Sequence, residues 1–266
     1  MIKKQSKKIA LSAVALGLCL ANSFAWASAA VSTASTFTPN QKTAIEKIVH
    51  DYLITHPTVL IEATQALQMQ QQKDMMSKAE SAIKGNAQAL FNHAETPIIG
   101  NPKGSVTLVE FFDYQCSVCQ RMAPVVNNLV KSNPNLRVVL KQWPIFGKDS
   151  AYAAKAALAS VKQNKFDVFY EAMISASGHL TKDRVLSLAK AVGIDTAQLE
   201  KDMNTPAFDK ELKDNLHLAE SLHLVGTPAF IIAKTPDGIY HGAQPYFVPG
   251  GASESTLQEL IAKAQA

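Results

Sequence analysis

The sequence contains two cysteines, Cys116 and Cys119, that are close enough along the chain to act together in one reaction. They are separated by two residues and directly follow an apolar, β-branched run, 105–112, which is typical of a buried strand. A helix that begins at Cys116 would place partial positive charge and free backbone N–H groups beside a thiolate there. That thiolate can attack a disulfide sulfur, and a second thiol one turn along can resolve the mixed disulfide. The spacing therefore favours thiol–disulfide exchange.

Two other uses of the cysteine pair fit the sequence less well. A structural zinc site usually takes four ligands from two such pairs, but there is one pair and the seven histidines have no matching spacing. A purely structural disulfide would close a very short loop and stabilise the protein little by the loop-entropy account. We therefore expect no metal and no separate cofactor, the redox group being the Cys116–Cys119 disulfide itself.

The first 27 residues are typical of an export signal. Four lysines lie within the first eight residues, an apolar run follows, and Ala25-Trp26-Ala27 offers a cleavage site that would start the mature chain at Ser28. The apolar run is shorter than the ~20 residues that a membrane-spanning helix needs, which disfavours an anchor. A lipoprotein attached through Cys19 is disfavoured because Leu18 is not small.

The composition excludes several classes of protein. The chain has 266 residues, of which 47% are hydrophobic and 18% charged, unlike a disordered chain. Lys and Arg total 26 against 22 Asp and Glu, and the excess of four equals the four lysines of the export signal. The mature chain is therefore close to neutral, and no nucleic-acid partner is expected. Two remaining cysteines are too few for a disulfide-rich miniprotein.

The mature chain begins with a flexible lead, 28–38, and a helical region, 39–93. Apolar residues recur at three- and four-residue spacing from Ile45 to Leu53, His56-Pro57 interrupts the helix, and a second helix runs to about Lys84. These helices have too few large apolar side chains to close a core alone. Their apolar stripe needs a partner, either the rest of the chain or a second copy, and pairing of long amphipathic helices favours a homodimer. The methionines at 69, 75 and 76 suit packing better than copper binding.

The remainder, 94–266, has an α/β pattern that follows a hinge at 85–96. Strands are expected at 105–112 and 136–142 with a helix between them, which predicts a parallel pair. Residues 149–223 are mostly helical in pattern. A third strand at 229–233 and a short fourth at 239–241 would form a hairpin, and a helix capped by Ser253 or Ser255 covers 253–264.

The segment Glu110–Cys119, EFFDYQCSVC, resembles the active-site segment of DsbA-type thiol:disulfide oxidoreductases of the thioredoxin superfamily. Gln120–Pro124 is similar to the thioredoxin continuation, and Val225–Phe230, VGTPAF, resembles the loop that carries the superfamily's cis-proline. The resemblance covers about 97–266. It implies a thioredoxin fold with an inserted helical subdomain at about 149–223.

The resemblance also implies roles for the residues of these motifs. Cys116 would be the exposed nucleophile and Cys119 the buried resolving thiol. Pro228, in cis, would lie against the cysteine pair, and Gly226, Thr227 and Pro228 would bind an extended substrate through backbone groups.

Glu110 stands where the family has a buried acid that assists proton transfer at the resolving cysteine. A buried carboxylate is costly without a task or a partner. Lys141, on the next predicted strand, is the candidate partner, and the alternative is that either residue lies at the sheet edge in solvent.

Three features place the chain among the subgroups of the family. Ser117-Val118 replaces the Pro-His of the best-known DsbA oxidases, which argues against a very strong oxidant. Thr227 is similar to the threonine of DsbC- and DsbG-type isomerases, which are dimers. The segment Asp51–Pro57 resembles the N-terminal extension of DsbA-like surface antigens and of the ScsC group, where it drives self-association.

These observations predict an exported protein disulfide oxidoreductase that forms, and additionally isomerises, disulfide bonds in exported proteins. Its expected partners are unfolded or partly folded exported proteins, a DsbB- or DsbD-like membrane redox partner, and a second copy of itself. The expected location is the periplasm, with outer-membrane association or surface exposure as alternatives. A chaperone-like or surface-associated binding protein with a secondary redox role is the alternative function.

Overall fold

The computed structural model describes residues 37–92 and 96–266. The predicted export signal, 1–27, and all but the end of the flexible lead lie outside the described residues. Contacts divide the chain after Leu60 into two compact units, Met1–Leu60 and Ile61–Ala266, each of which is described by itself. Among the described residues, no helix has the length and apolar character needed to cross a membrane.

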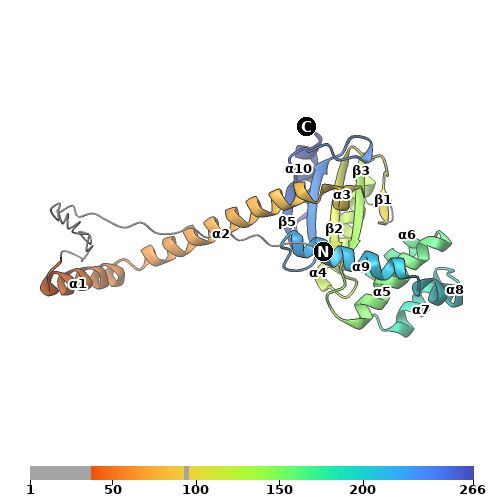
Figure 1. Cartoon of the computed structure of the whole chain (residues 1–266), viewed down its shortest axis with the longest axis horizontal. Helices are drawn as coiled ribbons and strands as arrows, with labels where there is room; N and C mark the ends of the chain where they lie inside the picture. Colours follow the sequence, from red (N-terminus) through yellow and green to blue (C-terminus); the bar gives the residue numbers. More distant parts are fainter. Residues whose placement is uncertain (1–36, 93–95) are drawn as a thin grey trace, which may run out of the picture. The chain divides into compact units, whose positions relative to one another are not determined.

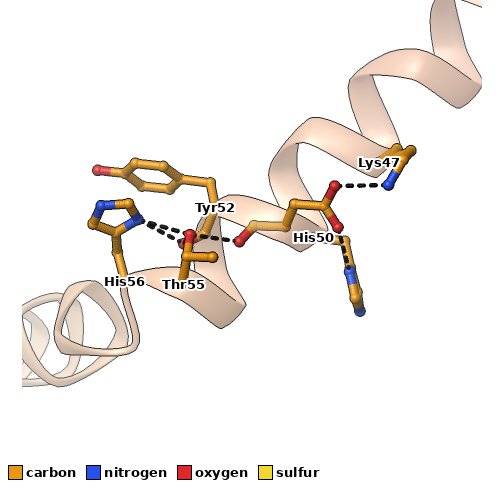
Figure 2. A network of polar contacts seen from close by, with 6 residues as sticks. Lys47, His50, Tyr52, Thr55 and His56 are labelled. Carbon is orange, nitrogen blue, oxygen red and sulfur yellow. Dashed lines mark hydrogen bonds and ion pairs between the residues drawn. The ribbon is translucent and has the colours of Figure 1, made fainter.

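The first unit contains α1 (Pro39–Thr55) and the start of α2 (Thr58–Gly85), as the sequence predicts. At the start of α1, Thr38 and Gln41 form a reciprocal capping box. Figure 2 shows how the helix ends: the Thr55 hydroxyl donates to the Asp51 carbonyl at 2.7 Å, and the His56 ring stacks on Tyr52 at 4.6 Å. Pro57 follows directly and separates the two helices. No residue of α1 is buried, and its large apolar side chains are exposed except Leu53, which is partly buried.

The second unit is built on a mixed sheet in the order β1-β3-β2-β4-β5. Its strands are β1 (Ile98–Gly100), β2 (Val106–Phe112), β3 (Leu136–Gln142), β4 (Ala229–Lys234) and β5 (Tyr246–Pro249). As predicted, β2 and β3 are parallel, with Glu110 opposite Leu140, while the other pairs are antiparallel. Every residue of β2 and β3 is buried, which includes the polar and charged residues Thr107, Glu110, Arg137, Lys141 and Gln142.

Helices cover both faces of this sheet (Figure 1). The β2–β3 crossover is α4 (Ser117–Ser132), and the chain closes with α10 (Glu254–Gln265), whose cap is Ser253 as predicted. The predicted helical insertion comprises α5 (Lys148–Ser160), α6 (Phe166–Ile174), α7 (Lys182–Ala191), α8 (Thr196–Met203) and α9 (Pro206–Ser221). The α/β class and the inserted helices are therefore confirmed.

The two faces of the sheet carry separate apolar clusters. Leu108 and Phe112 pack with α4, α10 and the insertion, whereas Val109 and Phe111 pack on the opposite face. That second cluster includes the end of α2 and the short α3 (Ala87–Phe91), where Leu90 and Phe91 are fully buried. The prediction of a hinge over 85–96 is therefore wrong where α3 lies, because buried apolar side chains hold this helix against the sheet. The predicted boundary between the helical region 39–93 and the domain 94–266 stays a prediction.

The predicted fourth strand at 239–241 is also wrong. A 3₁₀ turn at Pro236–Gly238 has positive φ angles at Asp237 and Gly238, and the chain pairs with β4 only from Tyr246. A Cβ at Gly238 would lie 2.5 Å from the Pro102 carbonyl oxygen, so this turn requires glycine. Ile239 is left exposed beyond the turn. The three-residue β1 was not predicted.

Candidate active site

The cysteine pair lies at the N-terminus of α4, immediately after β2. Cys116 is the cap of this helix, and its Sγ accepts a hydrogen bond from the Cys119 N–H at 3.4 Å. The Cys116 N–H donates to the Asp113 carbonyl at 3.1 Å, which turns the chain from the strand into the helix. Both cysteines are free thiols in the structure. The N-terminus of the helix therefore points a backbone N–H toward the Cys116 sulfur, and this arrangement stabilises a thiolate.

The loop before β4 lies against the same sulfur. The Cys116 thiol donates to the Thr227 carbonyl at 3.3 Å, and the Thr227–Pro228 peptide bond is cis, as the resemblance implies. The sequence-predicted residues Cys116, Thr227 and Pro228 are thus brought together. Cys116 differs from the expected exposed nucleophile, because only 4% of its surface is accessible where this loop lies over it.

Glu110 is buried and acts electrostatically on Cys119, the second cysteine of the pair. Glu110 is 1% exposed, and its Oε2 has no hydrogen-bond partner among the described residues. Burial raises the pKa of Glu110 to about 8. Burial first, and then the charge of Glu110, raise the pKa of the Cys119 thiol. Glu110, whose pKa is about 8, therefore lies close to Cys119, whose thiol resists ionisation.

Lys141 is not the partner of Glu110. The parallel register places Glu110 beside Leu140, so Lys141 projects to the opposite face of the sheet. There its Nζ donates to the Thr96 hydroxyl at 2.7 Å and lies 3.9 Å from Glu211. Burial lowers the pKa of Lys141 to about 8. The expected pairing is wrong, although both residues are buried as the first interpretation required.

Two polar residues that the sequence analysis missed hold the turn before Cys116. Gln115 exchanges two 3.1 Å hydrogen bonds with the backbone of Leu180, which ties the turn to the helical insertion. The Asp113 carboxylate accepts from the N–H groups of Gln115 at 2.7 Å, Ile145 at 2.7 Å and Phe146 at 3.1 Å. In the sequence, the only indication of a role for Asp113 is that its carboxylate comes directly after a buried strand.

A pocket of about 220 Å³ lies on the Pro228 side of the site. Gly226, Thr227 and Pro228, the predicted substrate-binding residues, line it together with apolar side chains from α2 and β5, including Met75 and Phe247. Val225, at its rim, is 90% exposed. Within the described residues, no three His, Cys, Asp or Glu side chains gather closely enough to hold a metal ion.

Two family models match the chain. The model described as DSBA-like thioredoxin domain matches residues 107–262, which include Glu110, Cys116, Cys119, Thr227 and Pro228. The model described as copper resistance protein ScsC N-terminal domain matches residues 41–73.

Individual proteins show the same likeness. A thioredoxin-like oxidoreductase from Silicibacter pomeroyi is 39% identical, with a TM-score of 0.62, over 68% of this chain and 98% of its own. Salmonella enterica Typhimurium BcfH is 28% identical, with a TM-score of 0.72, over 85% of this chain and 97% of its own. The thiol:disulfide interchange protein DsbA of Bordetella pertussis is 25% identical over 51% of this chain and 67% of its own.

Proposed function

Because this chain belongs to the family of DSBA-like thioredoxin domains, we propose that it forms disulfide bonds in exported proteins through Cys116 and Cys119. One observation carries the proposal. The Cys116 sulfur lies between the Cys119 N–H, at 3.4 Å, and the Thr227 carbonyl, at 3.3 Å. The first contact stabilises a thiolate, and the second places the sulfur beside backbone that an extended client can follow.

The reaction balances without a bound cofactor. In the oxidised pair, a client thiolate attacks the Cys116 sulfur, the intramolecular S–S bond breaks, and Cys119 leaves as a thiolate. A second client thiolate then attacks the client sulfur of the mixed disulfide and releases Cys116. The client loses two electrons and the pair gains them. A disulfide-bearing membrane partner of the DsbB kind reoxidises the pair.

Glu110 manages the proton at Cys119 in this scheme. The departing Cys119 thiolate is buried next to Glu110, where two negative charges would repel each other. The protonated carboxyl donates its proton to the Cys119 sulfur and takes it back on reoxidation. A pKa of about 8 suits Glu110 to both transfers near neutral pH.

Residues 39–93 mediate self-association in our proposal. The exposed apolar residues of α1 include Ile45, Ile48, Val49 and Tyr52, and no residue of this helix is buried in the single chain. The match of 41–73 to the ScsC N-terminal model supports a shared role for this segment. A homodimer would present two cysteine pairs to one client, which favours isomerisation in addition to oxidation. We place the protein in the periplasm, reached by the export signal at 1–27.

Oxidative refolding of a reduced, unfolded disulfide protein tests the proposal. The chain with its oxidised pair should restore client activity, and Cys116→Ala should abolish this restoration. Cys119→Ala, which cannot form the pair, should instead accumulate mixed disulfides when its Cys116 thiolate attacks a client that already carries disulfides. Ser117→Ala, an exposed change between the cysteines, is the matched control and should retain most activity. Full restoration by Cys116→Ala would overturn the proposal.

A further inference from the structure

The buried Glu110 carboxyl has to exchange its proton with solvent. Its pKa of about 8 keeps it mostly protonated at neutral pH, so after it donates to Cys119 it takes up a second proton from outside. On reoxidation it must release that proton before it can accept the one that Cys119 gives up. Glu110, Cys119 and Cys116 are all buried, so none of them meets bulk water directly. The proton therefore has to travel through other polar groups.

The hydroxyl of Tyr114 is a buried polar group that can carry this proton. Tyr114 is 1% exposed, and neither its hydroxyl nor Glu110 Oε2 has a hydrogen-bond partner among the described residues. Burial first, and then the charges of Glu110 and Asp113, raise the pKa of Tyr114, so the hydroxyl lies within the field of the Glu110 carboxylate. Unpartnered buried polar groups cost free energy, and one internal water between these two would satisfy both. Tyr114 and Glu110 are thus suited to exchange a proton through such a water.

Tyr170 of α6 leads from Tyr114 toward the surface. The centroids of the two rings are 6.1 Å apart, in an edge contact. Tyr170 also lines a pocket of about 440 Å³, together with Glu171, whose carboxylate accepts from the Asn127 amide at 2.7 Å. Burial first, and then the charges of Glu110, Tyr114 and Glu171, raise the pKa of Tyr170. Tyr170 therefore lies between the buried acid and an exposed carboxylate at the pocket.

We propose that Tyr114 and Tyr170 are positioning residues whose hydroxyls relay protons between Glu110 and solvent in the pocket beside Glu171. This inference rests on the proposed function, because it supplies the proton that Glu110 gives to Cys119. In uptake, Glu110 accepts one proton through Tyr114, the Tyr114 hydroxyl is refilled from Tyr170, and solvent in the pocket refills Tyr170. Each hydroxyl gives one proton and takes one, so neither is left as a phenolate. Release runs the same steps in reverse.

A packing role accounts for the Tyr114 ring but not for its hydroxyl. The ring makes edge contacts with Phe112 at 5.0 Å and with Tyr170, and phenylalanine would keep both. A buried hydroxyl without a partner destabilises the fold. Elsewhere the fold does pair such a group, since the Tyr240 hydroxyl donates to the Ala243 carbonyl at 2.6 Å. The Tyr114 hydroxyl is therefore better explained by proton transfer than by stability.

Time-resolved infrared spectroscopy of the reduced full chain tests the relay. A light-released acid lowers the pH from above to below the pKa of Glu110, and the carbonyl band of the protonated carboxyl, identified by its loss in Glu110→Gln, is followed in time. Tyr114→Phe and Tyr170→Phe should each slow the rise of this band, by about 100-fold for Tyr114→Phe. The double variant should be no slower than the slower single variant, because both hydroxyls serve one path.

Tyr152→Phe is the matched control. The Tyr152 hydroxyl is also buried without a partner among the described residues, but the charges that act on it are those of Lys182, Glu200 and Asp183. This variant should leave the rate of proton uptake unaltered. In urea unfolding, Tyr114→Phe should be at least as stable as the natural chain, which separates slowed uptake from damage to the fold.

Two results would overturn the relay. Uptake rates in Tyr114→Phe and Tyr170→Phe that stay within about twofold of the natural rate would show that protons reach Glu110 by another path. A clear loss of stability in Tyr114→Phe would show that its hydroxyl makes a structural hydrogen bond instead. The measurement uses no client, so it can fail while the proposed function stands, whereas client refolding by Cys116→Ala would overturn the proposed function itself.

Discussion

Glu110 should make the protein lose stability as pH rises, and Glu110→Gln should remove that loss. In the unfolded chain this carboxyl ionises near 4.5, whereas burial raises its pKa in the folded protein to about 8. Between these two values the unfolded state binds fewer protons than the folded state. The free energy of unfolding therefore falls with rising pH throughout this window, and the loss is complete above about pH 8.

The size of the loss follows from the two values. Each pH unit in the window costs about 1.4 kcal/mol, so the whole rise from 4.5 to about 8 corresponds to about 5 kcal/mol. This is a large fraction of the stability of a typical domain. Glutamine has the same shape without the ionisation, and any cost of its buried amide is independent of pH.

Urea unfolding of the reduced protein at several values between pH 4.5 and 8.5 measures this effect. The stability of Glu110→Gln relative to the natural chain should increase by several kcal/mol across this range, and disulfide exchange should slow because Cys119 loses its proton donor. Glu62→Gln, an exposed change on α2, is the matched control and should show a much smaller pH-dependent difference. A difference between Glu110→Gln and the natural chain that stays constant within about 1 kcal/mol would refute the assigned protonation of Glu110.

Three further predictions concern association and packing. Ile48→Lys, which places a charge on the exposed apolar face of α1, should convert a homodimer to monomers in analytical ultracentrifugation without unfolding the chain, and an unchanged mass would contradict the role given to α1. Glu211→Leu should lower the free energy of unfolding by about 3 kcal/mol or more, because it leaves the buried Lys141 charge without its nearest carboxylate. Gly104→Ala should destabilise the protein by about 1–3 kcal/mol in urea titrations, since its Cβ would lie 2.5 Å from the Asn135 carbonyl oxygen. Gly85→Ala, whose Cβ would have no neighbour within 4 Å, is the control for that variant.

Local sequence signals predicted most of the fold and the centre of the site. The buried strands β2 and β3 are rich in apolar and β-branched residues, and the cysteine pair and the proline loop are short motifs. The strand expected at 239–241 failed because Asp237 and Gly238 adopt positive φ, which a short β-branched and aromatic run does not reveal.

Side-chain partners across the fold were harder to predict. Lys141 was assigned to Glu110 because both lie on neighbouring strands, but the register that separates them onto opposite faces is a property of the assembled sheet. Asp113 and Gln115 were missed because their partners are 32 or more residues away, at Ile145, Phe146 and Leu180. Hydrogen bonds over such distances leave no periodic trace in one sequence.

The most direct test of disulfide exchange through Cys116 is mass spectrometry of Cys119→Ala after reaction with a peptide that carries one activated disulfide. The account predicts one covalent adduct, joined to Cys116 and released by reductant, and it predicts that Cys116→Ala forms this adduct far more slowly through Cys119, which lies deeper and whose thiol has a raised pKa. An adduct that forms equally fast in both variants would contradict the assignment of Cys116 as the attacking thiol.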